Sequence, residues 1–168
     1  MAEVERILVD AMLGRLARWL RLLGLDATLL QRPPSQPPPD QLLLTRRVKL
    51  RGRRGVVFIE HDRLVDQLRQ TVGLPGLNIR PEAFFTRCLE CNQPVRAIGR
   101  DQAAAVVADH VLMTAERFTQ CPRCGKVFWP GSHGQRALEF LRQAGAWPIH
   151  PNGRRGDANR SEIAEQGS

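Results

Sequence analysis

All four cysteines of this chain fall into two close pairs. Cys88 pairs with Cys91 and Cys121 with Cys124, in the stretches RCLEC and QCPRC. A two-residue spacer lets both thiolates of a pair reach one ion, and two such pairs complete the tetrahedron of sulfur ligands that zinc prefers. Without a secretory signal, paired cysteines favour metal binding over disulfides. A closed set of four thiolates predicts a structural zinc ion, which also compensates for a small core.

A second group of candidate residues consists of aspartates at the ends of apolar runs. Asp10 ends ILVD, Asp26 precedes ATLL, and Asp62 follows VVFIE. In open α/β sheets, ligands bind beyond the carboxyl ends of the strands. Asp10 and Asp62 are therefore expected at one edge, where carboxylates would share Mg²⁺ or Mn²⁺. The alternative is that both residues only cap the helices that follow them.

Basic residues are concentrated in two places, and the chain carries a net charge of +8. Three arginines lie three residues apart within 11–23, and TRRVKLRGRR at 45–54 holds six basic residues and no acid. Such clusters gain affinity for phosphate backbones by releasing counterions, which predicts a polyanionic partner. The alternative is a solvated basic loop. The residues expected to contact a nucleic acid are Arg15, Arg18, Arg21, Arg46, Arg47 and Lys49.

The elements that would position these residues alternate between strand and helix. Apolar and β-branched runs predict strands over 5–10, 26–30, 42–46 and 56–60. Leucines three and four residues apart predict a helix over 11–23, and a second helix is expected over 62–71 with Asp62 as its N-cap. Strands and helices in this order, with short connections, predict an α/β domain with a mostly parallel sheet.

The remaining sequence is organised around the cysteines. The turn-rich stretch 74–82 is the expected boundary between a domain over 1–80 and a zinc ribbon with a C-terminal helix over 81–145. Helices are expected over 101–113 and over 133–144, the latter opened by a capping box of Ser132 and Gln135. The polar, glycine-rich tail over 146–168 is expected to be disordered.

Composition and patterning exclude several classes of protein. Hydrophobic residues make up 42% and charged residues 25% of the chain, which is a globular composition. No apolar run approaches the ~18 residues that a membrane span needs. The first ten residues carry acids where a signal peptide carries bases. We therefore expect an intracellular protein, cytoplasmic or nuclear and not secreted, with no membrane partner.

Together these motifs resemble the PIN-like ribonuclease family, in the version fused to a zinc ribbon. That version occurs alone in prokaryotes and at the C-terminus of mut-seven-type 3′–5′ exonucleases. The resemblance spans roughly residues 5–144 and is carried by VDAMLGRLARWLRLLGLDA, LLTR, DQLRQ, RCLECNQPV and QCPRCGKVFWPGSH. It implies a Rossmann-like three-layer domain, a nuclease site of acids that uses Mg²⁺ or Mn²⁺, and an RNA substrate. Asp10, Asp26 and Asp62 match the acids of that site.

The chain departs from the family pattern at one position of the expected site. The third strand of the family ends LLTRD, whereas this chain reads LLLTRR, with Arg47 where the acid belongs. Arginine cannot ligate Mg²⁺. The helix that precedes this strand in the family is also absent, because QPPPDQ joins LLLTR directly. The sequence thus predicts a shortened or divergent member with an impaired site.

Three functions remain open from the sequence. The first is a metal-dependent ribonuclease, and the second is a catalytically inactive RNA-binding module stabilised by structural zinc. The third is a protein-interaction module that uses the proline stretch 33–39 as a partner's ligand. The resemblance further leaves open that the chain is one domain of an exonuclease in a longer protein.

Overall fold

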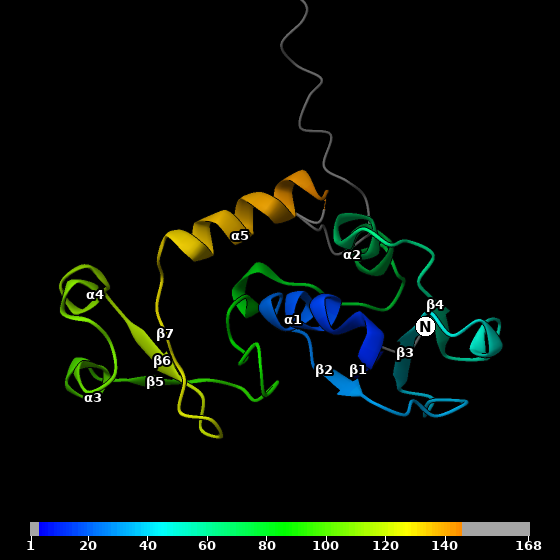
Figure 1. Ribbon diagram of the computed structural model, residues 1–168, viewed down its shortest axis with the longest axis horizontal. Coiled ribbons are helices and arrows are strands. Elements are labelled where there is room, and N and C mark those ends of the chain that lie inside the picture. Colours follow the sequence, from blue (N-terminus) through cyan, green and yellow to red (C-terminus); the bar gives the residue numbers. More distant parts are fainter. Residues whose placement is uncertain (1–3, 146–168) are drawn as a thin grey trace, which may run out of the picture.

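The computed structural model describes residues 4–145 (Figure 1). Its first part is built on a four-stranded parallel sheet, which confirms the predicted α/β class. The tail over 146–168, expected to be disordered, lies outside the described residues. The strands are β1 (Arg6–Asp10), β2 (Ala27–Leu30), β3 (Gln41–Thr45) and β4 (Val56–Phe58), in the order β2-β1-β3-β4.

The two central strands, β1 and β3, are buried on both faces of the sheet, as is usual for parallel sheets. On one face, Val9 and Leu44 join the main core beneath α1 (Gly14–Leu22) and α2 (Leu64–Val72). A single 3-10 turn, η1 (Ala11–Leu13), connects β1 to α1. On the other face, Leu8 and Leu43 pack against Leu50 of the 3-10 helix η2 (Val48–Leu50). Alternating residues of each strand therefore serve two cores.

The crossover from β2 to β3 is a loop without a helix within residues 31–40. It passes β1, which pairs in parallel with both strands. Prolines fix φ and keep such a segment extended, so a short loop spans the distance. Pro37 packs against Gly55, whose φ is +72° and where a Cβ would lie 2.8 Å from the proline ring. This close approach requires glycine at position 55.

The cysteine-bearing part forms a small antiparallel sheet with its own core. Its strands are β5 (Arg96–Ile98), β6 (Phe118–Gln120) and β7 (Val127–Phe128), in that order. The single helix expected over 101–113 is instead two, α3 (Arg100–Ala104) and α4 (Asp109–Thr114). The first of these helices ends at Ala104, and the chain folds back so that Val111 packs with Ala103.

The last helix, α5 (Ser132–Gln143), returns to the first part of the molecule. Figure 1 shows it running over α1 from the ribbon towards α2. Leu141 and Ala144 are fully buried in the main core, and Arg69 of α2 donates a hydrogen bond to the carbonyl oxygen of Ala144 (2.9 Å). The C-terminal helix is thus held by the sheet domain and not by the ribbon alone.

Two of the expected helix caps are wrong. Helix α2 begins at Leu64 with Arg63 as its N-cap, so Asp62 does not cap it. Helix α5 begins one residue earlier than expected, with Gly131 as its N-cap and no side-chain capping bond. Among the helices within residues 4–145, none is long and apolar enough to cross a membrane.

Candidate functional sites

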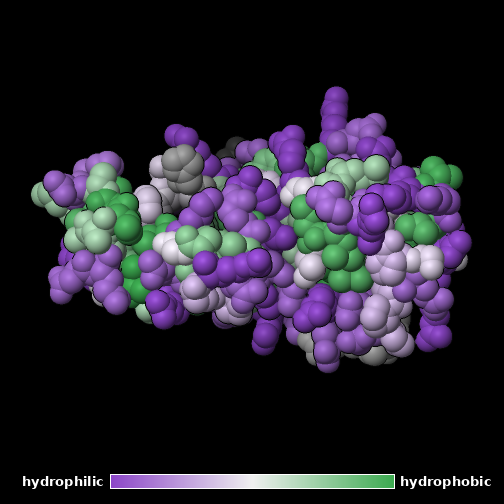
Figure 2. All heavy atoms as spheres, turned by 60° about the horizontal axis from the view of Figure 1, so that its bottom comes forward, coloured by the Kyte–Doolittle hydropathy of each residue, from purple (hydrophilic) through white to green (hydrophobic). Residues whose placement is uncertain are grey.

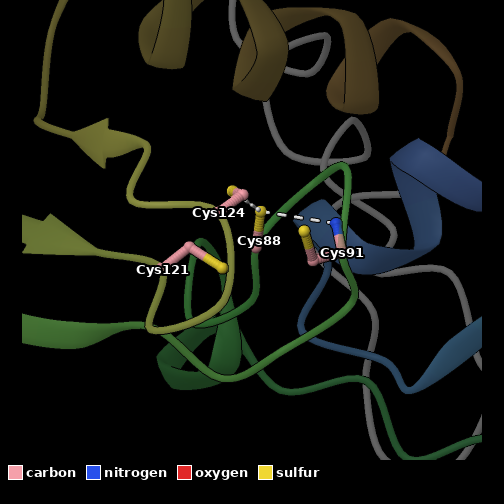
Figure 3. Close-up of side chains that lie close together, drawn as sticks. All are labelled: Cys88, Cys91, Cys121 and Cys124. Atoms are coloured by element: carbon pink, nitrogen blue, oxygen red, sulfur yellow. Dashed lines mark hydrogen bonds between the residues drawn. The ribbon is translucent and has the colours of Figure 1, made fainter.

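The four cysteine side chains point towards one another where the ribbon meets α1 (Figure 3). Their sulfur atoms all lie within 4.8 Å of one another, and the Sγ atoms of Cys88 and Cys124 are 3.8 Å apart. Sulfurs bound tetrahedrally to zinc at ~2.3 Å have about this separation. The cluster is compatible with a zinc ribbon, in agreement with the spacing of the cysteines in the sequence.

The two cysteine pairs have the same backbone geometry. In the first, the N–H of Asn92 donates to the carbonyl oxygen of Cys88 (2.9 Å), and in the second the N–H of Gly125 donates to that of Cys121 (3.0 Å). Both residues have positive φ, +62° at Asn92 and +73° at Gly125. Glycine and asparagine tolerate this conformation best, so each pair closes into a tight turn that aims its sulfurs inward.

The thiols of the cluster influence one another electrostatically. Burial raises the pKa of Cys121, but backbone N–H groups of Cys124 and Arg123 outweigh it and lower this pKa to about 7. In contrast, a hydrogen bond with Cys124, burial and neighbouring sulfur charges raise the pKa of Cys91 to about 12. Thiols this close do not all ionise unless a cation offsets the repulsion, which is the role of a bound metal.

The first cysteine pair is fastened to the sheet domain by a buried arginine. Arg21 of α1 is 6% exposed, and its guanidinium donates to the carbonyl oxygens of Ala27 (2.9 Å), Leu89 (2.7 Å) and Glu90 (2.8 Å). Burial lowers its pKa below the ordinary value, against the opposing effect of Cys88. Arg21 is therefore not placed to contact RNA, which corrects the expectation from its spacing with Arg15 and Arg18.

Asp26 and Asp10 lie at opposite ends of the parallel strands, Asp26 at the amino end and Asp10 at the carboxyl end. Asp26 precedes β2, whose Ala27 pairs with Ile7 at the beginning of β1. Its Oδ1 accepts a hydrogen bond from Nδ2 of Asn92 (2.7 Å). The side-chain oxygen of Asn92 accepts another from the backbone N–H of Ala27 (3.1 Å). The structure thus does not bring Asp26 to the expected acidic edge, and joins it to the cysteine pair instead.

Asp10 lies at the carboxyl end of β1, as predicted, and its side chain is 1% exposed. Its Oδ2 accepts hydrogen bonds from Oγ1 of Thr45 and from Nε of Arg47, each at 2.7 Å. Nη2 of Arg47 lies 3.3 Å from Oδ1, so the guanidinium donates hydrogen bonds to both carboxylate oxygens. The backbone N–H of Arg47 in turn donates to Oγ1 of Thr45 (3.0 Å). Thr45, the last residue of β3, belongs to the LLTR motif but was not among the candidate site residues.

The charge of Asp10 is stabilised despite burial. Burial alone raises the pKa of this carboxyl, but hydrogen bonds from Arg47 and Thr45 and the positive charge of Arg47 outweigh it. The net result is a pKa below the usual value for aspartate. The same pair raises the pKa of Arg47. Asp10 is therefore an ionised carboxylate whose oxygens are already engaged.

Asp62 follows β4 at the same end of the sheet, as expected, but is paired with another arginine. Its side chain is 85% exposed and forms an ion pair with Nη1 of Arg46. Because β3 separates β1 from β4, the strands that lead to Asp10 and to Asp62 are about 10 Å apart across the sheet, and Asp62 lies in the loop beyond the end of β4. Consecutive arginines thus neutralise the two acids separately.

The residues at this edge do not fit a divalent cation. Mg²⁺ requires an octahedron of oxygen ligands at about 2.1 Å, usually from one or two carboxylates. Here the buried carboxylate is gripped by a guanidinium, and the second acid is two strands away. A positive group in contact with Asp10 stands where a metal ion would need to be.

Other predicted contacts remain at the surface. Arg15, Arg18 and Lys49 are exposed, and Arg18 forms an ion pair with Glu90. Figure 2 shows that hydrophilic residues cover most of one face of the molecule. A hydrophobic patch lies at the end of this face that carries α3 and α4. Exposed apolar side chains there belong to Val106 and Met113.

A parallel α/β sheet with an acid at a strand end, joined to a four-cysteine ribbon, is consistent with the class of PIN-like ribonuclease domains with a zinc ribbon. The family model described as the Mut7-C RNAse domain matches residues 5–141. The chain belongs to this family, as the sequence motifs predicted. Among curated proteins and among solved structures, no match to the chain was found.

Proposed function

We propose that this chain is an RNA-binding member of the ribonuclease family in which Arg47 has replaced a metal-binding acid. The two-point ion pair of Arg47 with Asp10 carries the proposal. A metal-dependent nuclease needs free carboxylate oxygens for its ions. Here the guanidinium uses both oxygens of Asp10, so the protein binds RNA without hydrolysing it.

The charge at the sheet edge supports RNA as the ligand. Buried Asp10 is neutralised by its partner, so it does not repel a phosphate backbone. Lys49 of η2 and Arg53 of the loop that follows it are exposed, and neither forms an ion pair among residues 4–145. Exposed cations at one edge attract phosphates and release their counterions. This is the sequence-independent mode of RNA binding.

The cysteine cluster has a structural role in this proposal. Four thiolates complete the coordination of zinc and leave no open position for a substrate. The cluster lies at the junction with α1, where Arg21 and Asn92 hold it to the sheet domain. Zinc bound there fixes the ribbon relative to the basic surface and takes no part in hydrolysis.

A metal-dependent ribonuclease is the second candidate, favoured by the family match and by the place of Asp10 at a strand end. It requires Arg47 to leave Asp10. The two candidates differ in one measurable property, which is cleavage that depends on Mg²⁺ or Mn²⁺ and on Asp10.

The test uses an end-labelled single-stranded RNA of twelve nucleotides and the full chain. We expect binding by fluorescence anisotropy that weakens steeply between 50 and 200 mM salt, by about tenfold for every two to three phosphates that are contacted. We expect no shortening of the RNA with Mg²⁺ or Mn²⁺. Lys49→Gln should weaken binding and reduce the salt dependence by about one counterion.

Arg117→Gln is the matched control for that variant. Arg117 is exposed in the ribbon, just before β6, and its loss should leave RNA binding unchanged. Metal-dependent cleavage by the wild type that disappears in Asp10→Asn would establish the ribonuclease instead. Absence of both binding and cleavage would leave the protein-interaction function.

A further inference from the structure

A pocket of about 300 Å³ lies between α1, the first cysteine pair and α5. It is separate from the end of the sheet that carries Asp10 and Arg47. Its walls are mainly apolar, and two exposed arginines border it. The lining residues are Arg15, Arg18, Trp19, Leu22, Leu89 and Ala137. Pockets of this size are at the lower limit for small-molecule sites, which suits a single ring system with a sugar.

An aromatic wall of this pocket is held in place by the fold. The indole of Trp19 packs against the ring of Phe140 on α5, with the ring centroids 4.6 Å apart. Arg21, two residues further along α1, fixes the backbone of Leu89 through its carbonyl oxygen. The pocket is therefore formed between two anchored elements and does not depend on a free loop.

The charges around the pocket favour an anionic ligand. Arg15 forms no ion pair among the described residues, whereas Arg18 pairs with Glu90. Glu90 is also 3.5 Å from Nζ of Lys126, so one acid faces two cations. With Arg15 added, the surroundings carry a positive surplus. An apolar floor beside unpaired positive charge is complementary to a nucleobase that carries phosphates.

We propose that this pocket holds one nucleotide of a bound RNA strand. The base lies against Trp19 and Leu89, and the adjoining phosphates contact Arg15 and Arg18. This inference rests on the proposed RNA binding and extends its path, because α1 leaves the sheet edge directly after η1 and carries both arginines. The bound RNA therefore runs from the basic segment 45–54 along α1 to the ribbon.

The test compares intact RNA with the same twelve-nucleotide RNA whose bases have been removed. Base stacking on an aromatic side chain makes a difference of about tenfold or more for one base. We expect the wild type to bind intact RNA at least tenfold more tightly than abasic RNA at equal salt. Equal affinities for intact and abasic RNA would overturn the proposal that the pocket holds a base, while the proposed RNA binding would stand. Absence of any RNA binding would overturn both proposals.

A variant that fills the pocket locates the base. Ala137→Phe should weaken binding of intact RNA about tenfold, to the level of abasic RNA, and leave the salt dependence unchanged. Ala104→Phe, the same change at an exposed position of α3, should have no effect. Undiminished preference for intact RNA in a folded Ala137→Phe variant would overturn the assignment. If that variant does not fold, the abasic comparison in the wild type still decides.

A free nucleotide carries the same base and phosphate groups and is the alternative occupant of the pocket. AMP replaces the RNA in a titration followed by the fluorescence of Trp19, in a background with Trp129→Phe and Trp147→Phe. Saturation in the millimolar range, weaker than for RNA, is expected if the pocket serves one nucleotide of a strand. AMP that binds more tightly than the twelve-nucleotide RNA would assign the pocket to free nucleotides and overturn the proposal.

Discussion

Arg47 binds Asp10 through two nitrogen atoms, with Nε 2.7 Å from Oδ2 and Nη2 3.3 Å from Oδ1. Planar two-point contacts of this kind are the strongest that arginine makes with a carboxylate. Because Asp10 is buried at a strand end, this pair decides what the edge of the sheet is able to bind. It holds a fixed cation where the family pattern has an acid.

Removal of the Arg47 guanidinium should destabilise the protein in a pH-dependent way. In Arg47→Met, buried Asp10 loses its strongest partner, and the free energy of unfolding should fall at pH 7. The pKa of Asp10 is depressed in the folded wild type, so the pair stabilises above the unfolded pKa of about 3.9. That stabilisation is lost as the pH falls through the lower folded value.

Urea unfolding of both proteins at pH 7 and pH 3 measures this difference. The difference in the free energy of unfolding between the wild type and Arg47→Met should be smaller at pH 3 than at pH 7. Adding Asp10→Asn to Arg47→Met should recover part of the loss at pH 7, because an uncharged amide is cheaper to bury. An equal gap at both pH values would show that Arg47 stabilises only through packing.

An acid at position 47 should create a site for a divalent cation. Arg47→Asp removes the guanidinium and places a second carboxylate beside Asp10, giving the oxygen ligands that Mn²⁺ and Mg²⁺ prefer. We expect Mn²⁺ to raise the melting temperature of this variant and RNA cleavage to increase. Arg117→Asp makes the same charge change at an exposed position of the ribbon, away from this edge, and should do neither. Unchanged cleavage would mean that a missing ligand is not the main defect.

Zinc removal should destabilise the whole described structure and not just the ribbon. Arg21 and Asn92 connect the first cysteine pair to α1 and β2, so loss of the cluster loosens contacts of the sheet domain. Metal analysis should give about one zinc per chain, and a chelator should lower the melting temperature in a single transition. Cys121→Ser should reproduce the effect without a chelator. Two separate transitions would indicate independent parts.

Asp26 should contribute to stability and not to RNA chemistry. Its carboxylate holds Asn92, so Asp26→Ala and Asn92→Ala should each lower the free energy of unfolding, with a coupling of about 1 kcal/mol between them. RNA affinity should stay within about twofold in Asp26→Ala, since this residue lies at the edge away from Asp10. A selective loss of RNA cleavage or binding in a stable Asp26→Ala variant would return it to the active site.

Local patterns in the sequence determined the elements and the cysteine cluster. Apolar runs predicted the four strands of the main sheet, because a parallel sheet buried on both faces needs such runs. The two-residue spacing of the cysteines predicted their convergence, because each pair closes within one turn. The aspartate at the end of the first strand was likewise placed correctly at the sheet edge.

Only the tertiary structure decided what each charged residue does. Arg15, Arg18 and Arg21 have the same type and spacing, yet Arg21 alone is buried, because the first cysteine pair packs over the end of α1. Strand direction likewise placed Asp26 opposite Asp10. The contact of Arg47 with Asp10 joins the end of β1 to a residue two positions after β3, and no local pattern in the sequence specifies which acid Arg47 contacts. Side-chain partners depend on which segments pack together, whereas strands and turns depend mainly on neighbours along the chain.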